Sequence, residues 1–190
     1  MLNVVIFGAP GSGKGTQSER MIEKYGLAHI STGDVLRAEI KSGSELGKVA
    51  EGYISKGQLL PDELIVDILA DVLDKREITK GVIFDGFPRT IPQAEALKKM
   101  LEERGMNISV VLGLEVEEEE LIARLLKRGE MSGRSDDNMD TIKSRLDVYN
   151  NQTNPLKDYY VTEGKYSQIK GVGSIDDIFE QIKRAIAILD

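Results

Sequence analysis

The stretch Gly8-Ala9-Pro10-Gly11-Ser12-Gly13-Lys14 lies between an apolar run, Leu2–Phe7, and a segment of helical periodicity, residues 14–25. The pattern Gly-x4-Gly-Lys between a strand and a helix is typical of a phosphate-binding loop. Glycines let the backbone follow a phosphate closely, and successive N–H groups at a helix N-terminus attract negative charge. Lys14 adds a full positive charge for the terminal phosphates. The stretch therefore predicts an α/β domain that binds phosphate groups.

Apolar blocks and helical periods continue to alternate along the chain. Expected strands cover 2–7, 82–85, 109–114 and 166–170, and His29 is expected to pack in a strand without chemistry of its own. Expected helices cover 14–25, two short segments within 34–57, 61–77, 91–104, 117–128, 140–150, 155–163 and 175–189, with a polar, mobile loop at 129–139. This order predicts a parallel sheet with helices on both faces.

Composition restricts the class of protein. A length of 190 residues with 41% hydrophobic and 30% charged residues fits one compact domain. The net charge of −7 argues against nucleic acid as the main partner. The absence of cysteine excludes disulfides and cysteine-ligated zinc, and a single histidine excludes multi-histidine metal sites. No apolar run approaches the ~18–20 residues of a membrane span, so we expect a cytoplasmic protein without a membrane partner.

Several ordered motifs follow the phosphate-binding loop. They are Ser31-Thr32-Gly33-Asp34-Val35-Leu36-Arg37, Asp85-Gly86-Phe87-Pro88-Arg89, Gln93, Arg124 to Arg128 with the next Gly, Ser132-Gly133-Arg134-Ser135-Asp136-Asp137, and Arg145. Together with the loop they resemble the adenylate kinase family of nucleoside monophosphate kinases, over essentially the whole chain. One feature departs from the general loop pattern: Gly15, not Ser or Thr, follows Lys14, and Thr16 comes next.

The resemblance implies a P-loop NTPase fold of three α/β/α layers around a five-stranded parallel sheet. The core would comprise 1–30, 61–126 and 138–190, with a helical lobe for the nucleoside monophosphate (NMP) at 31–60 and a short lid at 127–137. The lid is the short form, without the zinc-bearing domain of longer relatives. The implied reaction is reversible phosphoryl transfer from Mg-ATP to AMP, giving two ADP, by a monomer.

The resemblance also implies the roles of individual residues. The ATP-binding residues would be Gly11, Ser12, Gly13, Lys14, Gly15, Thr16, Arg128 and Gly173. The AMP-binding residues would be Thr32, Arg37, Gln58, Leu59, Leu60, Gly86, Phe87, Pro88, Arg89, Gln93, Arg134 and Arg145. The catalytic residues would be Lys14, Arg89, Arg128, Arg134 and Arg145. Mg²⁺ would bind through the nucleotide and water, either with Asp85 holding that water or with Asp85 only capping the Gly86 turn. Arg124 would either contact the nucleotide or only support its helix, and Asp136 and Asp137 would orient the lid arginines.

Three other kinds of protein share part of this pattern. A uridylate/cytidylate kinase shares the fold and the lid motif, but tends to carry Ala in place of Thr32 and Asn in place of Gln93. A Gln side chain both donates and accepts, so it can pair with the adenine edge. A GTPase-type switch would need an Asn-Lys-x-Asp base reader, and the chain contains no Asn-Lys pair. A sugar or shikimate-type kinase would keep the loop but not the Thr32 and Gln93 set.

Overall fold

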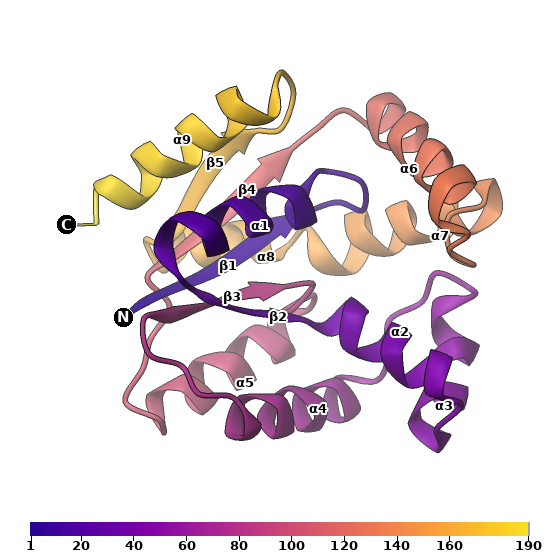
Figure 1. Ribbon diagram of the computed structural model, residues 1–190, viewed down its shortest axis with the longest axis horizontal. Coiled ribbons are helices and arrows are strands. Elements are labelled where there is room, and N and C mark those ends of the chain that lie inside the picture. The colour runs from indigo at the N-terminus through magenta and orange to yellow at the C-terminus, as the bar shows by residue number, and fades with distance from the viewer. Residues whose placement is uncertain (190) are drawn as a thin grey trace.

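The computed structural model describes residues 1–189, and residue 190 of the expected core segment 138–190 lies outside the described residues. Within that range the chain forms a five-stranded sheet in the order β2-β3-β1-β4-β5, with every neighbouring pair parallel (Figure 1). The strands are β1 (Leu2–Gly8), β2 (Ala28–Ser31), β3 (Gly81–Asp85), β4 (Val110–Glu115) and β5 (Tyr166–Lys170). The expected parallel sheet is confirmed, and His29 lies in β2.

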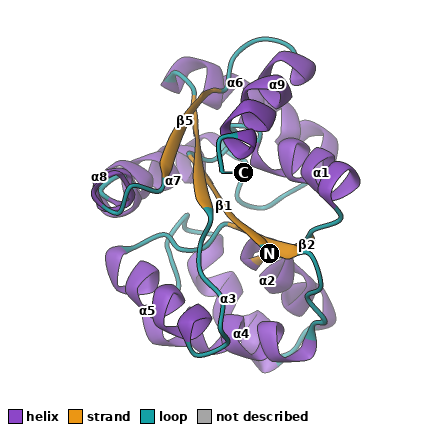
Figure 2. Ribbon diagram, turned by 90° about the vertical axis from the view of Figure 1, so that its left-hand side faces the viewer, coloured by secondary structure: helices purple, strands orange, loops and turns teal. Residues whose placement is uncertain are grey.

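Helices connect the strands and cover both faces of the sheet. They are α1 (Lys14–Tyr25), α2 (Thr32–Ser42), α3 (Glu45–Ile54), α4 (Asp62–Lys75), α5 (Ile91–Glu102), α6 (Glu118–Ser132), α7 (Met139–Val148), α8 (Leu156–Thr162) and α9 (Ile175–Ala187), with a π-helical turn at Tyr149–Thr153. Side chains of β1 alternate between two cores. Val4 and Ile6 pack with α1 and α9, whereas Val5 and Phe7 pack with α4, α5 and α8. Figure 2 shows these helices on opposite sides of the strands.

The lid helix differs from its expected extent. Helix α6 continues through Ser132, whereas the sequence predicts that it ends at Arg128 and that a loop covers 129–139. Gly129 lies inside the helix and does not end it. A glycine is needed there because the backbone of Asp137 packs closely against it: a Cβ at residue 129 would lie 2.6 Å from the carbonyl oxygen of Asp137. Gly133 ends the helix instead, in the left-handed conformation at φ 64°. The irregular segment between α6 and α7 is therefore shorter than expected.

The lobe formed by α2 and α3 and the pair α6 and α7 project from the same end of the sheet (Figure 1). At this end, β1 leads into the phosphate-binding loop and β3 leads into the Gly86 turn. In open parallel sheets, ligands bind outside the carboxyl ends of the strands. Among residues 1–189, no helix has the length and apolar character needed to cross a bilayer.

Candidate active site

The phosphate-binding loop joins β1 to α1 as expected. Helix α1 has no side-chain cap, and the N–H of Gln17 makes its first backbone bond, to the oxygen of Gly13. Because the N–H of Ser12 is bonded to the oxygen of Ala9, the amides that a phosphate can use are those of residues 13–16. Glycine is required at two positions. Gly13 has φ 98°, and Gly11 has φ 82° with a Cβ position only 2.9 Å from Cγ of Leu125 on α6.

Lys14 is folded back onto the loop in this state. Its Nζ donates to the oxygens of Gly8 at 2.9 Å and Ala9 at 3.1 Å. Burial, with the nearby charges of Arg89 and Arg145 adding, lowers the pKa of Lys14 to about 8. The ammonium group thus lies at the loop but lacks an anionic partner strong enough to offset its burial.

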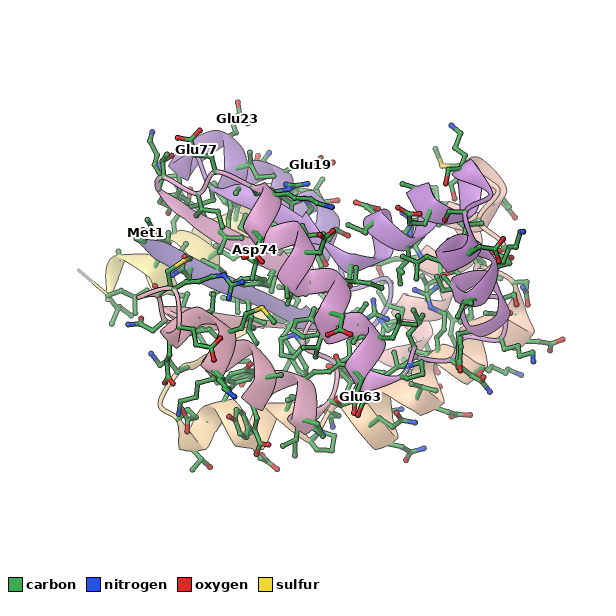
Figure 3. The ribbon with its side chains drawn as sticks, turned by 90° about the horizontal axis from the view of Figure 1, so that it is seen from below. Met1, Glu19, Glu23, Glu63, Asp74 and Glu77 are labelled. Carbon is green, nitrogen blue, oxygen red and sulfur yellow. The ribbon has the colours of Figure 1, made fainter. Side chains whose placement is uncertain are left out.

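A cavity of about 640 Å³ extends from the loop to the lid. All of the predicted ATP-binding residues line it, namely Gly11, Ser12, Gly13, Lys14, Gly15, Thr16, Arg128 and Gly173. Seven cationic side chains of the described chain line it as well: Lys14, Arg37, Arg89, Arg124, Arg128, Arg134 and Arg145. Only three carboxylates among the described residues do so: Glu19, Asp34 and Asp85. A chain of net charge −7 thus concentrates positive charge in one cavity, while acidic residues such as Glu23 and Glu77 lie on the outer surface (Figure 3).

The arginines in this cavity repel one another. Burial, together with Arg145, lowers the pKa of Arg89 to about 10. Burial and the neighbouring guanidinium groups also lower the pKa values of Arg134 and Arg145. Cations that depress one another's pKa values favour the binding of an anion, which relieves the repulsion.

A narrower cavity of about 70 Å³ lies beside the first, against α2 and α4. The predicted AMP-binding residues that line it are Thr32, Arg37, Gln58, Leu59, Leu60, Gly86, Arg89, Gln93 and Arg145. Three predicted residues lie elsewhere. Arg134 lines the large cavity. Pro88 lines a third cavity, of about 60 Å³, together with Lys14. Phe87 is buried in the apolar core and lines none of these three cavities.

The Gly86 turn joins several predicted AMP-binding residues. Thr32 Oγ1 donates to the oxygen of Gly86 at 2.9 Å, and Arg89 Nε donates to the same oxygen at 2.7 Å. Gly86 has φ 79°, and a Cβ there would lie 2.9 Å from the Arg89 guanidinium. A glycine is therefore required where the arginine crosses the turn. Gln93 is buried on α5 with its amide bonded within the protein.

Lid carboxylates hold two of the predicted catalytic arginines. Arg128 forms a two-pronged pair with Asp137, with Nε at 2.6 Å and Nη2 at 2.7 Å from its oxygens. Arg145 Nη1 lies 3.0 Å from Asp137 and 3.3 Å from Asp136. Although burial alone would raise the pKa of Asp137, the hydrogen bond and charge of Arg128 hold it below its usual value. This geometry favours the expected orienting role of the two aspartates.

Arg124 and Arg37 have local partners in this state. Arg124 pairs with Glu120 at 2.9 Å and donates to the backbone oxygen of Gly171 at 3.0 Å. These contacts favour a supporting role for Arg124. Arg37 donates to Asp34 at 2.6 Å from the first turns of α2. A phosphate between the arginines would have to compete with Asp34 for this guanidinium.

The sequence did not predict a role for His29. Its Nε2 lies 3.2 Å from Asp85 Oδ2, across the paired strands β2 and β3, and both residues line the large cavity. Gly57 is a second residue without a predicted role. It lines the two smaller cavities, and its Cβ position lies 2.9 Å from Arg145 Cγ. A glycine with φ 70° there lets the end of the α2–α3 lobe approach Arg145 closely. In the sequence, its position directly before the predicted AMP-binding residues Gln58, Leu59 and Leu60 is the signal that could have placed Gly57 at the site.

Comparisons with known proteins agree with this geometry. A family model described as Adenylate kinase matches residues 6–165. The chain belongs to the adenylate kinase family. A protein of Parabacteroides distasonis named adenylate kinase is 72% identical over 186 residues, 98% of each chain. One of Bacteroides fragilis with the same name is 70% identical over 189 residues, 100% of each chain, and one of Porphyromonas gingivalis is 57% identical over 178 residues.

Family membership confirms two expectations and excludes one. The chain is an enzyme, a phosphotransferase of the nucleoside monophosphate kinase type, with the three-layer P-loop fold. The GTPase-type switch is thereby excluded as the main activity. The roles of the individual residues remain predictions.

Proposed function

We propose that this adenylate kinase family member transfers the terminal phosphoryl group of Mg-ATP reversibly to AMP, forming two ADP. The observation that carries the proposal is that Gly86, Arg89 and Arg145 line both the large cavity and the narrow one. A phosphoryl group that passes from a nucleotide in the first cavity to one in the second would pass beside these three residues. The bond from the terminal phosphorus to the ADP oxygen breaks as a bond to an AMP phosphate oxygen forms.

The residues would act by position and charge. Lys14 and the α1 amides would hold the ATP phosphates, and Arg37 and Arg89 the AMP phosphate. Arg128, Arg134 and Arg145 would offset the charge on the transferring group, since forked guanidinium donors match phosphate oxygens. The acceptor is an ionised phosphate, so no general base is needed, and the rate would come from positioning and electrostatic stabilisation.

Magnesium fits the oxygen donors of the large cavity. Among residues 1–189, no group of three or more His, Cys, Asp and Glu side chains is arranged to hold a metal. Mg²⁺ at nucleotide sites commonly binds one or two carboxylates, substrate phosphates and several waters. Asp85 and the Thr16 hydroxyl line this cavity and could hold the waters of such an ion. Bound Mg²⁺ would neutralise part of the phosphate charge.

Adenine is the acceptor base that the narrow cavity supports best. Gln93 and Thr32 both line it, and they are the positions at which uridylate/cytidylate kinases tend to differ. Gln93 would read the adenine edge. The names of the three relatives reported above point the same way. In this proposal the protein balances adenine nucleotides as a cytoplasmic monomer.

A coupled assay of ATP with AMP, UMP, CMP and GMP in turn tests the proposed function. We expect AMP to give the highest kcat/KM. A pocket that hydrogen-bonds one base rejects analogues that leave its polar groups unpaired. Higher efficiency with UMP or CMP than with AMP would make the uridylate/cytidylate alternative correct.

We also propose that the lobe 31–60 and the lid 127–137 close over the substrates. Across residues 31–60, the buried apolar side chains are only Leu36, Ala50 and Leu60, and within 127–137 the buried side chains are Asp136 and Asp137. Segments with so little apolar burial open at low free energy.

Amide hydrogen exchange in both segments should therefore slow when diadenosine pentaphosphate binds. AMP alone should protect 31–60 more than the lid. The central strands β1 and β4 serve as the internal control and should be equally protected in all states. Unchanged exchange in both segments would contradict the closure.

A further inference from the structure

The orientation of the Gln93 amide is fixed by two partners within the protein. The side chain is buried, with only 2% of its surface exposed. Its Oε1 accepts from the backbone N–H of Arg89 at 2.8 Å, and its Nε2 donates to Asp62 Oδ1 at 2.8 Å. A backbone N–H can only donate and an ionised carboxylate can only accept. The oxygen of the amide must therefore lie on the Arg89 side and its nitrogen on the Asp62 side.

Asp62 is itself held by the N-terminus of α5. It is the first residue of α4, and the oxygen that accepts from Gln93 also accepts from Thr90 Oγ1 at 2.9 Å. Thr90 is the N-cap of α5, and its hydroxyl accepts from the backbone N–H of Gln93 at 3.3 Å. Asp62, Thr90 and Gln93 thus form a closed ring of hydrogen bonds between the N-termini of α4 and α5. The ring leaves the Gln93 side chain little freedom to turn over.

A Gln amide offers two N–H donors and two acceptor sites on its oxygen. Arg89 uses one acceptor site of the Gln93 oxygen and Asp62 uses one N–H donor of its nitrogen. One donor and one acceptor site remain for a base. The ring of hydrogen bonds determines on which side of the amide each of them lies. Adenine presents a donor at N6 beside an acceptor at N1, which this arrangement can match. Hypoxanthine presents the reverse, an acceptor at O6 beside a donor at N1–H. An amide turned over to suit it would place its oxygen against the Asp62 carboxylate and its N–H against that of Arg89.

We propose that Asp62 is a positioning residue that sets the base selectivity of the acceptor site by holding the Gln93 amide in the orientation that suits adenine. The proposal rests on the proposed function, in which Gln93 reads the base. Asp62 does not line the narrow cavity, so it acts through Gln93 and not on the nucleotide. A purely structural role, as an acidic residue in the first turn of α4, would predict no change in selectivity.

The test compares AMP with inosine monophosphate (IMP) as acceptors at saturating ATP. For Asp62→Ala we expect the preference for AMP over IMP in kcat/KM to fall about tenfold, because a hydrogen bond to a charged group no longer opposes the reversed amide. Most of the change should appear in KM for AMP, with KM for ATP unchanged. Asp62→Asn keeps an oxygen that can accept from both partners and should restore most of the preference.

Glu63→Ala is the matched control, because Glu63 is an exposed carboxylate in the same turn of α4 (Figure 3). It should leave both substrates unaffected. Gln93→Leu removes the proposed reader and should lower the AMP preference at least as far as Asp62→Ala does. Asp62→Leu, which keeps the branched shape of the side chain but has no oxygen to accept a hydrogen bond, provides the same measurement if the alanine variant is poorly folded.

The outcomes separate this proposal from the one on which it rests. An equal loss with AMP and IMP, or the same loss in Glu63→Ala, would make Asp62 a structural residue and overturn the inference. An unchanged preference for AMP in Asp62→Ala would also overturn the inference about Asp62. If Gln93→Leu lowered the preference in the same experiment, the proposal that Gln93 reads the base would still be supported. A wild-type protein that does not use AMP would instead refute the proposed function.

Discussion

Lys14→Ala is expected to lower turnover by about 10²–10³-fold with the fold retained, the cost typical of removing one charged or hydrogen-bonding group that stabilises the transition state. Lys14 lines the large cavity at the start of α1, among cations whose pKa values are lowered. Its charge would interact more strongly as negative charge develops on the transferring group, so kcat should fall more than KM rises.

Lys24→Ala provides the control for this result. Lys24 lies in the last turn of the same helix and is exposed, so its removal should leave turnover unchanged. Steady-state kinetics with circular dichroism on both variants decides the matter. Near-normal turnover in Lys14→Ala would remove the loop lysine from the mechanism.

Burial of the charged Lys14 side chain should lower the free energy of unfolding at neutral pH. Since burial lowers its pKa from 10.5 to about 8, the folded state binds this proton less tightly than the unfolded state. Below about pH 8 both states are protonated and the full cost is present; it is relieved as pH rises from about 8 to 10.5. Lys14→Met should therefore be more stable than wild type by up to about 3 kcal/mol at pH 7, and the difference should nearly vanish at pH 10.5. Urea unfolding at several pH values measures this, and a less stable Lys14→Met at pH 7 would contradict it.

The fold could be predicted because its determinants are local. The apolar runs at β1, β3 and β4, and the glycines of the loop, each specify their own conformation within a few residues. The end of α6 could not be predicted in this way, because a glycine such as Gly129 after a helical segment is the usual local signal for the end of a helix. What it serves is a contact with Asp137, across the lid, that only the folded chain reveals.

The candidate site divides in the same way. Residues inside motifs, such as Lys14 and Arg89, line the cavities where expected. Pairs between motifs were missed. His29 meets Asp85 only because β2 and β3 are neighbours in the sheet, and Asp62 meets Gln93 only because α4 packs beside α5. Strand order and helix packing are tertiary facts, and no spacing within one motif encodes them.

Arg89→Lys is the second substitution with a large expected effect, although it preserves the charge. Arg89 donates through Nε to the oxygen of Gly86 and lines all three cavities around the reaction centre. A guanidinium can hold that oxygen with Nε and still present its two terminal nitrogens to phosphate, whereas a lysine ammonium is a single point of donation. The turn would lose a donor, and the transferring group would lose a forked partner.

We expect kcat/KM for AMP to fall about 10²–10³-fold in Arg89→Lys, with KM for ATP little changed. Arg104→Lys is the control, because Arg104 pairs with Asp74 and lines none of these three cavities. The double variant with Arg145→Lys tests whether the two arginines share one phosphoryl group. If they do, the loss of transition-state stabilisation in the double variant should be well below the sum of the losses in the two single variants, since the effects of residues that act on one group are not additive. Strictly additive losses would place the arginines on separate phosphates, and a loss in ATP binding equal to that in AMP would assign Arg89 to the donor side.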